Sequence, residues 1–300
     1  MTSTGKAASE GPAPAAAVET TGRRAPMALV TGAFLVLVLL IVAVLLVVKV
    51  TRGTTTLTPP PVAPAAAGTV RAATGVPRSA FDTVGAPHPA GPLPTVLDRQ
   101  PSLTIGGRPA VVYVGSEFCP YCAAARWPLV VALGRFGTFT HLGATSSSVL
   151  EAFPGIQTFS FDGTSYRSRY LSWSAVEQYG QGLDATAPAG FHLLHRLSPL
   201  QQVLLTRYGT GAGGPELPFI DIGNRVVVEG AAIGFSPGTL QGLSVNQIAT
   251  DLSAPSTAVA QAVLGAANEI SAAICATTGG KPGAVCSSPG VRAGAARLGL

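Results

Sequence analysis

Two of the four cysteines, Cys119 and Cys122, flank a Pro-Tyr dipeptide in the segment SEFCPYCAAARW, residues 116–127. The run before them, PAVVYVGSEF (109–118), is short, apolar and rich in β-branched residues, which predicts a buried strand. A helix is predicted to begin at about Pro120. At a helix N-terminus, unpaired N–H groups and the helix dipole stabilise negative charge. The sequence therefore predicts a nucleophilic thiolate at Cys119.

A thiolate beside a second thiol can form and break disulfides. In Cys-x-x-Cys pairs at helix N-termini, the cysteine pKa falls from about 8.5 to about 3.5–7.5. A static disulfide and half of a zinc site are alternative interpretations. The metal interpretation is disfavoured, because ten residues separate Cys275 from Cys286 and no histidine offers an H-x₃₋₅-H partner. We predict that Cys119 and Cys122 are catalytic, with no metal and no cofactor.

Other residues near the pair carry weaker signals. Glu117 is a candidate proton acceptor, although an exposed acid in a turn has the same sequence signature. Arg126 fits a solvated or a structural charge, and Asp221 is a candidate for facing the cleft. Trp127 and Trp173 are more typical of packing than of a ligand platform.

Cys275 and Cys286 differ from the first pair in their setting. Cys275 ends a predicted helix and Cys286 lies in the Gly/Pro-rich run GGKPGAVCSSPG. A bond between them would close a loop of about a dozen residues and contribute about 2–3 kcal/mol by constraining the unfolded chain. We favour a structural disulfide; a second redox pair that relays electrons and two free thiols are the alternatives. A persistent disulfide favours an oxidising, exported compartment.

The hydrophobic periodicity predicts an α/β domain with a mixed sheet. The predicted elements are a strand over 109–118, a helix over 120–136, a strand over 156–163, a segment of ambiguous type over 168–179, a helix over 199–209, a β-hairpin over 217–233 and a helix over 256–275.

The N-terminal third holds a candidate membrane anchor. From Ala28 to Val48 no residue is charged over 21 positions, enough to cross a hydrocarbon core of about 30 Å. We predict a transmembrane helix over 27–50, a disordered cytoplasmic tail over 1–26 and a Pro/Ala-rich linker over 51–80. A cleaved signal peptide and a buried soluble helix are less favoured, because the run is too long for either. Flanking positive charges are nearly balanced, so they decide the orientation weakly.

The charge of the chain disfavours nucleic acid as a partner. The net charge is +5, and residues 1–53 account for +3 of it with five basic and two acidic residues. The remaining +2 is spread over residues 54–300 without a Lys/Arg cluster, so it makes no electrostatic footprint for DNA or RNA.

The segment VVYVGSEFCPYCAAARW resembles the strand, CxxC and helix start of the thioredoxin superfamily, with the Pro-Tyr dipeptide of glutaredoxins. Together with LVVALGRFGTF, LPFIDIGN and AAICATTGGKPGAVC, it is similar to the membrane-anchored thioredoxin-like family catalogued as domain of unknown function 929, over about residues 80–290. That family name implies no established activity. The resemblance implies a thioredoxin-like mixed sheet with an inserted subdomain, preceded by one transmembrane helix.

The superfamily resemblance also implies a cis-proline loop that faces the cysteines. Leu217-Pro218-Phe219 matches it, so Leu217 and Pro218, with Pro120 and Tyr121, are the expected substrate-binding residues. Phe118 departs from the tryptophan that is usual in thioredoxins before the first cysteine.

The distance along the chain from the cysteines to the expected cis proline is long. Some 99 residues separate Cys119 from Pro218, which implies an insertion at about 143–210 within a domain over 81–290. Residues 291–300 are expected to form a flexible tail.

The expected activity is that of a membrane-anchored, extracytoplasmic thiol–disulfide oxidoreductase, single-pass in the cell membrane. Its expected partners are protein thiols or disulfides, and a redox partner in the membrane is a further candidate. The direction of exchange is left open. The rival interpretation is a non-catalytic binding scaffold or a copper chaperone on a thioredoxin fold.

Overall fold

The computed structural model describes residues 37–44, 62–87, 91–211 and 214–300. The chain divides into two units, Met1–Thr55 and Thr56–Leu300, and the second holds all four cysteines. The predicted tail (1–26) lies outside the described residues. Of the predicted span (27–50), residues 37–44 are described, and they are helical.

Among the described residues, one helix is long and apolar enough to cross a bilayer, judged by length and composition. This helix is α7 (Ala258–Thr277), and 89% of its most apolar stretch is buried inside the domain. It lies near the C-terminus, not ahead of the domain. Because a helix that is apolar all round also suits a protein interior, we describe α7 as part of the core.

A mixed sheet forms the centre of the domain, in the order β9, β4, β12, β13 and β2, with β3 also paired to β4. These strands are β2 (Thr95–Val96), β3 (Thr104–Ile105), β4 (Arg108–Gly115), β9 (Ser172–Glu177), β12 (Phe219–Ile222) and β13 (Val226–Glu229). β9 runs parallel to β4, whereas β12 is antiparallel to both β4 and β13.

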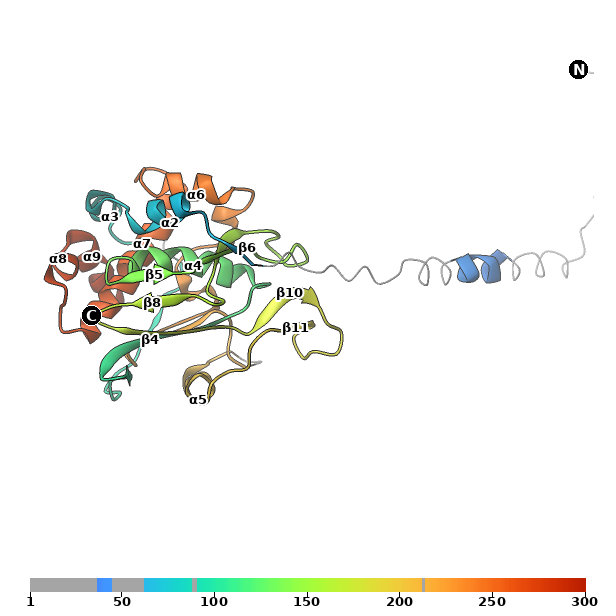
Figure 1. Cartoon of the computed structure of the whole chain (residues 1–300), viewed down its shortest axis with the longest axis horizontal. Coiled ribbons are helices and arrows are strands. Elements are labelled where there is room, and N and C mark those ends of the chain that lie inside the picture. Colours follow the sequence, from blue (N-terminus) through green and yellow to red (C-terminus); the bar gives the residue numbers. More distant parts are fainter. Residues whose placement is uncertain (1–36, 45–61, 88–90, 212–213) are drawn as a thin grey trace, which may run out of the picture. The chain divides into compact units, whose positions relative to one another are not determined.

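The central strand β4 is buried on both faces. Val111 and Tyr113 belong to the larger core with α4 (Pro120–Leu133) and α7, whereas Val112 and Val114 pack with residues of α5 (Pro199–Tyr208). Successive side chains of a strand point to opposite faces, so the near-continuous apolar run in the sequence fits a strand between two helical layers. Figure 1 shows α5 on the opposite side of the sheet from α2 and α6.

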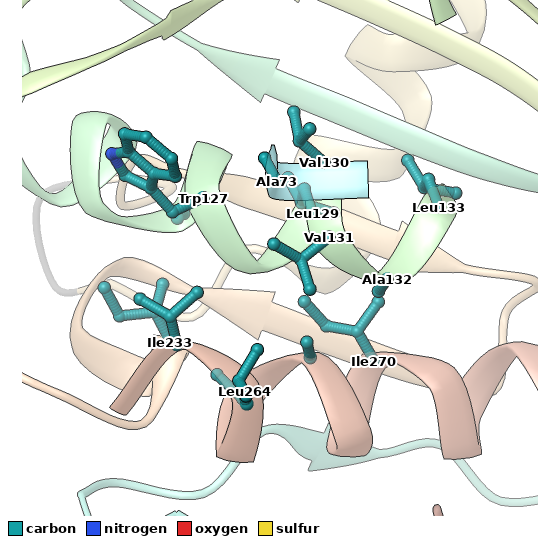
Figure 2. Packing of buried hydrophobic residues seen from close by; sticks show 14 of the residues in the cluster. Ala73, Trp127, Leu129, Val130, Val131, Ala132, Leu133, Ile233, Leu264 and Ile270 are labelled. Carbon is teal, nitrogen blue, oxygen red and sulfur yellow. The ribbon is translucent and has the colours of Figure 1, made fainter. Parts of the chain in front are cut away.

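The helix α4 carries the cysteines at one end and is packed along its whole length. All but one of its side chains are buried, and Pro128 lies inside it. In Figure 2, Val131 and Ala132 point toward α7, which carries Leu264 and Ile270. This burial fixes the helix N-terminus, and hence the cysteines, against the end of β4.

The remaining elements surround this centre. They are β1 (Ala63–Pro64), α2 (Ala67–Thr74), α3 (Arg78–Val84), β5 (Thr138–Thr140), β6 (Gly143–Ser146), β7 (Gln157–Ser160), β8 (Ser165–Arg167), β10 (Tyr179–Leu183), β11 (Phe191–Leu193), the 3₁₀ turns η1 (Gly230–Ile233) and η2 (Pro237–Leu240), α6 (Val245–Asp251), α8 (Gly283–Cys286) and α9 (Pro289–Leu298).

The structure corrects both ends of the expected domain. The C-terminal residues form α9 rather than a flexible tail over 291–300, because Val291 and Leu298 are buried. Gly294 makes this contact possible, since a Cβ there would lie 2.8 Å from the backbone of Asn268 in α7. At the other end, α2 and the first residues of α3 fall within the predicted linker (51–80), but both helices pack in the domain, since their apolar side chains join the core.

The predicted insertion at about 143–210 is not separate from the central sheet. It contains β9, which pairs with β4 over six residues, and α5, which covers one face of the sheet. Within the ambiguous segment 168–179, residues 172–177 form the strand β9. The predicted hairpin over 217–233 is shorter than expected, because η1 begins at Gly230.

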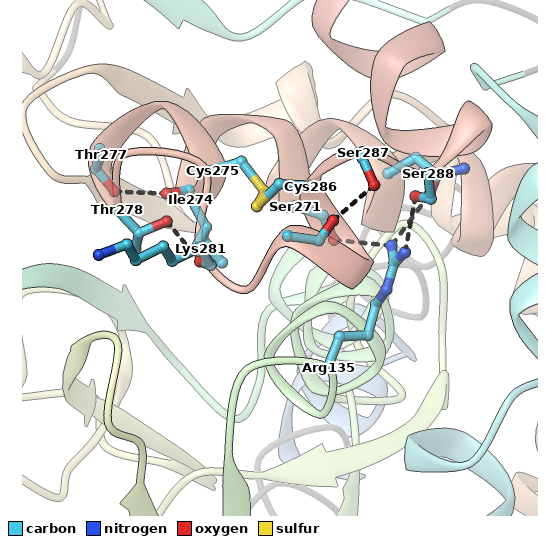
Figure 3. Close-up of a disulfide and its surroundings, with 12 residues drawn as sticks. Arg135, Ser271, Ile274, Cys275, Thr277, Thr278, Lys281, Cys286, Ser287 and Ser288 are labelled. Atoms are coloured by element: carbon cyan, nitrogen blue, oxygen red, sulfur yellow. Dashed lines mark hydrogen bonds between the residues drawn. A yellow bond between two sulfur atoms is a disulfide. The ribbon is translucent and has the colours of Figure 1, made fainter.

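Cys275 and Cys286 are joined in a disulfide that ties α8 to the end of α7 (Figure 3). Close to it, the Arg135 guanidinium donates to the hydroxyls of Ser271 and Ser288 at 3.2 Å each. Burial lowers the pKa of Arg135 to about 10. The disulfide and this arginine together hold the start of α9 against α4 and α7.

We expect the Cys275→Ala/Cys286→Ala variant to lose about 2–3 kcal/mol of unfolding free energy, because the unfolded chain is no longer closed into a loop. Urea unfolding of the parent and the variant measures the difference in unfolding free energy. The Cys275–Cys286 disulfide of the parent is kept intact during the measurement. Equal stability would contradict a structural role for the bond.

Candidate functional site

The cysteine pair lies at the junction between β4 and α4. Cys119 is the N-cap of α4, and its sulfur accepts the backbone N–H of Cys122 at 3.1 Å. Pro120 occupies the first turn, where a helix needs no N–H donor. Cys119 is 7% exposed and Cys122 is fully buried. Of the two cysteines, Cys119 is the one that keeps some exposure to solvent.

The two thiols have pKa values shifted in opposite directions. The hydrogen bond from the Cys122 thiol lowers the pKa of Cys119; burial opposes this, while the Cys122 backbone N–H and the charge of Arg126 reinforce it. Burial raises the pKa of Cys122 well above its ordinary value, and its hydrogen bond to Cys119 raises it further. Cys119 is therefore the first to ionise, and the proton of the pair stays on Cys122.

We expect iodoacetamide to modify Cys119 of the reduced protein with a pH midpoint below the ordinary value of about 8.5, because the thiolate is the reacting form. The Cys122→Ala variant is expected to shift this midpoint upward, since the hydrogen bond that lowers the Cys119 pKa is lost. Alkylation rates between pH 5 and 10, with mass mapping of the modified cysteine, measure both. A midpoint at or above that of a free thiol, or equal modification of Cys122, would contradict this assignment.

The loop before β12 faces the pair. The Cys119 thiol donates to the carbonyl oxygen of Leu217 at 3.7 Å. The peptide bond between Leu217 and Pro218 is cis, which is the geometry that the resemblance implies. The Pro218 carbonyl accepts the N–H of Gly230 at 2.9 Å, so the loop is tied to the end of β13. The structure thus brings Leu217 and Pro218 to the cysteines from about 100 residues along the chain.

Aromatic side chains frame the junction. Phe118 stacks on Phe191 of β11 with ring centroids 3.9 Å apart. Tyr121, between the two cysteines, is half-buried and meets Phe153 edge to face at 6.0 Å. The carbonyl of Phe118 accepts the N–H of Ser148 at 2.9 Å. The loop that follows β6 and the strand β11 therefore contact the residues on either side of Cys119.

A buried group of charges lies next to the pair. Arg126, one turn beyond Cys122 on α4, is fully buried and makes a two-pronged contact with Glu177 at 2.9 and 2.6 Å. Its Nη2 also donates to the Ser116 carbonyl at 2.9 Å and lies 3.6 Å from Glu117. Glu117 is 2% exposed, so it is not an acid in an open turn. Arg126 is likewise not a solvated charge.

One arginine thus faces two carboxylates. Burial opposes the charge on Arg126, but the carboxylate of Glu177 and, less strongly, that of Glu117 keep its pKa well above the ordinary value. Burial raises the pKa of Glu177 to about 7, with Arg126 opposing and Glu117 adding to the rise. Glu177 is therefore poised to take up or release a proton near neutral pH.

Glu177 is the site residue that sequence reasoning missed. It ends β9, on the same face as Trp173 and Ala175, and that face packs against the larger core. The sequence signal that could have found Glu177 is an acidic residue on the buried face of a strand. That signal was weak, because the segment 168–179 could not be assigned to helix or strand from the sequence. The Tyr113 hydroxyl approaches Glu177 at 3.5 Å, and it can pass there because Gly115 has no side chain: a Cβ would lie 2.0 Å from that hydroxyl.

The other candidates lie away from the pair. Asp221 is fully buried in the β12–β13 hairpin, where its Oδ1 accepts the N–H of Asn224 at 2.7 Å. Burial raises the pKa of Asp221 to about 6. Trp127 donates to the Gln157 carbonyl at 2.9 Å, and Trp173 stacks with Tyr113 in the core. These contacts are structural. In the part of the chain that the structure describes, no group of three or more His, Cys, Asp and Glu side chains is arranged to hold a metal ion.

Comparison with known families decides the relationship of the chain. The model of a family described as a domain of unknown function, DUF929, matches residues 99–276, more than half of the chain. The chain belongs to the DUF929 family. The DUF929 match contains Cys119, Cys122, Glu177 and the Leu217-Pro218 loop, and it ends before Cys286. No match was found among curated proteins or among solved structures.

Proposed function

We propose that this DUF929 protein is a thiol–disulfide oxidoreductase that exchanges disulfides with protein substrates. The observation that carries the proposal is the asymmetry of the pair: Cys119 keeps 7% of its surface exposed and has a lowered pKa, whereas Cys122 is fully buried and has a raised pKa, so it retains its proton. In a two-step exchange, Cys119 would attack the substrate first and Cys122 would then resolve the mixed disulfide.

We propose a thioredoxin-like fold for the same domain. The support is the order of its central parts: β4, the CxxC helix α4, the parallel strand β9, the antiparallel hairpin β12–β13 and the helix α7. The cysteines follow the central strand, and a cis proline precedes the hairpin on the neighbouring strand. The short sheets built from β1, β6 and β7, from β5 and β8, and from β10 and β11 are additions to this arrangement.

In the reductive direction, the Cys119 thiolate attacks one sulfur of a substrate disulfide. The substrate S–S bond breaks, a mixed disulfide forms at Cys119, and the departing substrate thiolate takes a proton from solvent. Cys122 then loses its proton and attacks the Cys119 sulfur, which forms the Cys119–Cys122 bond and releases the second substrate thiolate. Two electrons pass from the protein to the substrate. Oxidation of a substrate dithiol is the same sequence reversed.

We propose that Glu177, held by the same Arg126 that acts on both cysteines, supports the second step. Cys122 is fully buried, so its proton needs an acceptor inside the protein. The charges of Glu177 and Cys122 act on each other, and the Glu177 pKa of about 7 suits an acceptor near neutral pH. Arg126 holds the Glu177 carboxylate in place through its two-pronged contact.

We further propose that a single span over 27–50 anchors the protein, with the domain of residues 62–300 outside the cytoplasm. The uncharged run from Ala28 to Val48 supports the anchor, and residues 37–44 within it are helical. The Cys275–Cys286 disulfide supports an oxidising compartment, since such bonds rarely persist in the cytosol.

Trapping a mixed disulfide tests the proposed function. In the Cys122→Ala variant the resolving thiol is absent, so the product of the first step should accumulate on Cys119. Incubation with an oxidised peptide, followed by non-reducing mass analysis, detects it. The Cys119→Ala variant is the matched control and is expected to trap nothing. Failure of Cys122→Ala to trap peptide, while it remains folded by circular dichroism, would overturn the proposal.

A further inference from the structure

A cavity of about 390 Å³ opens beside the cysteine pair. One wall is the side chain of Tyr121, the residue before Cys122. The facing walls are Ala258 and Ala262 at the start of α7, and Phe235 after η1. At about 30 Å³ per water molecule, the cavity has room for about a dozen waters. An aliphatic or aromatic side chain needs less space than that.

The chemistry of the walls selects against charge. None of the described residues that line the cavity is charged. The hydroxyl of Ser236 already accepts the N–H of Gly238 at 3.2 Å, which leaves Thr239 and the Tyr121 phenol as the other side-chain hydroxyl groups at the cavity. A charged group placed there would lose its hydration without gaining a counter-charge. The cavity therefore suits an uncharged, largely apolar group.

Small residues keep the cavity open. Ala258 and Ala262 lie one helical turn apart, so they present adjacent positions of one face of α7. Gly91 and Gly234 also line the cavity, and the Gly91 N–H donates to the Gly234 carbonyl at 3.2 Å. A larger side chain at either Ala258 or Ala262 would occupy the space that a ligand group would take.

Tyr121 relates the cavity to the cysteine pair, because it lines the cavity and lies between Cys119 and Cys122 in the chain. Cys119 is 7% exposed, so a substrate sulfur must come down to it, and the residues that neighbour that sulfur must rest on the surrounding walls. The Tyr121 ring is held by its edge-to-face contact with Phe153. The part of the cavity wall that lies nearest to the cysteines in the chain is therefore held in place.

We propose that the cavity receives an apolar side chain of a protein substrate, from a residue that neighbours the reacting cysteine. This inference rests on the proposed function and adds a substrate class to it: cysteines flanked by large apolar residues exchange faster than cysteines flanked by small polar ones. Three observations support an apolar side chain in the cavity: its volume, the absence of charge among the described residues that line it, and its Tyr121 wall.

Exchange kinetics with two peptides test the inference. Each peptide carries one cysteine as a mixed disulfide with 5-thio-2-nitrobenzoate; leucines flank the cysteine in one and serines in the other. We expect the leucine peptide to react with the reduced protein about tenfold faster, a typical discrimination for an apolar pocket. The free aryl disulfide, which has no flanking residues, serves as the reference for Cys119 reactivity.

Filling the cavity supplies the decisive comparison. Ala258 is exposed at the rim, so Ala258→Trp is expected to abolish the preference while leaving the rate with the aryl disulfide within about twofold. Val203→Trp, at an exposed position of α5 on the other side of the sheet, is the matched control and should keep the preference. Should Ala258→Trp disturb the circular dichroism spectrum, Ala258→Leu fills part of the same space.

The outcomes are distinguishable. Equal rates for the two peptides with the parent protein, or a preference that survives filling, would overturn the inference and leave the oxidoreductase proposal intact. Absence of reaction with the aryl disulfide itself would instead overturn the proposed function.

Discussion

Replacing Cys119 with serine is expected to reduce disulfide exchange by about 10³-fold or more, to the uncatalysed rate. A serine hydroxyl stays protonated at neutral pH and cannot form a mixed disulfide, so both the nucleophile and the covalent intermediate are lost. The helix N-terminus and the Cys122 N–H, which stabilise the sulfur of Cys119 at 3.1 Å, have no thiolate to act on. Turnover with an oxidised model protein and a regenerating thiol measures the loss.

Two control variants define this result. Cys122→Ser should retain the first attack and lose only release of the mixed disulfide, because Cys122 is buried and enters the second step. Cys275→Ala/Cys286→Ala should exchange at the parent rate if the C-terminal bond is structural. Activity remaining in Cys119→Ser would refute the assignment of the nucleophile. A parallel loss in the double alanine variant would favour the electron relay.

Replacing Arg126 with leucine is expected to lower the unfolding free energy by about 3–5 kcal/mol, because it leaves buried carboxylates without their cation. Arg126 is fully buried and contacts Glu177 at 2.6 and 2.9 Å and Glu117 at 3.6 Å. Urea unfolding of the reduced proteins measures the loss. Arg78→Leu is the matched control: its ion pair with Asp82 lies at the surface and should contribute less than about 1 kcal/mol.

The pH dependence of stability tests the same group of charges. The folded-state pKa of Glu177 is about 7, above the unfolded value of about 4.3. The folded state therefore binds the proton more tightly, and the contribution of Glu177 to stability falls as pH rises from about 4.3 through about 7. Without Arg126 this fall should steepen, so Arg126→Leu should be more destabilising at pH 8 than at pH 5.

A double variant separates charge from packing. Arg126→Leu/Glu177→Leu removes the cation together with its closest carboxylate, so it should recover at least about 1 kcal/mol relative to Arg126→Leu alone. If the double variant is no more stable than the single one, the loss comes from packing around α4 and the assigned electrostatic role is wrong.

Local signals in the sequence were sufficient for the structural setting of Cys119 and Cys122. A β-rich apolar run followed by Cys-Pro-Tyr-Cys predicts a strand that leads into a helix, and β4 and α4 have these positions. The hairpin turn at Gly223 and Asn224 and the helix that begins after Ser198 follow equally local rules, with Ser198 capping α5 through a reciprocal bond with Gln201. Such features depend on neighbours within a few residues, so the chain itself encodes them.

Long-range packing decided the rest. Glu117 and Arg126 have the residue types of solvated side chains, and only burial brings Arg126 into contact with both Glu117 and Glu177. The C-terminal residues resemble a flexible tail because glycines and alanines dominate them, yet Gly294 allows α9 to lie against α7. These outcomes depend on which surfaces pack together, and a local sequence pattern does not identify the distant residues that it will contact. The sequence alone therefore determined that the two cysteines lie where a strand leads into a helix, whereas the tertiary structure decided which charges surround them and which cavity Tyr121 lines.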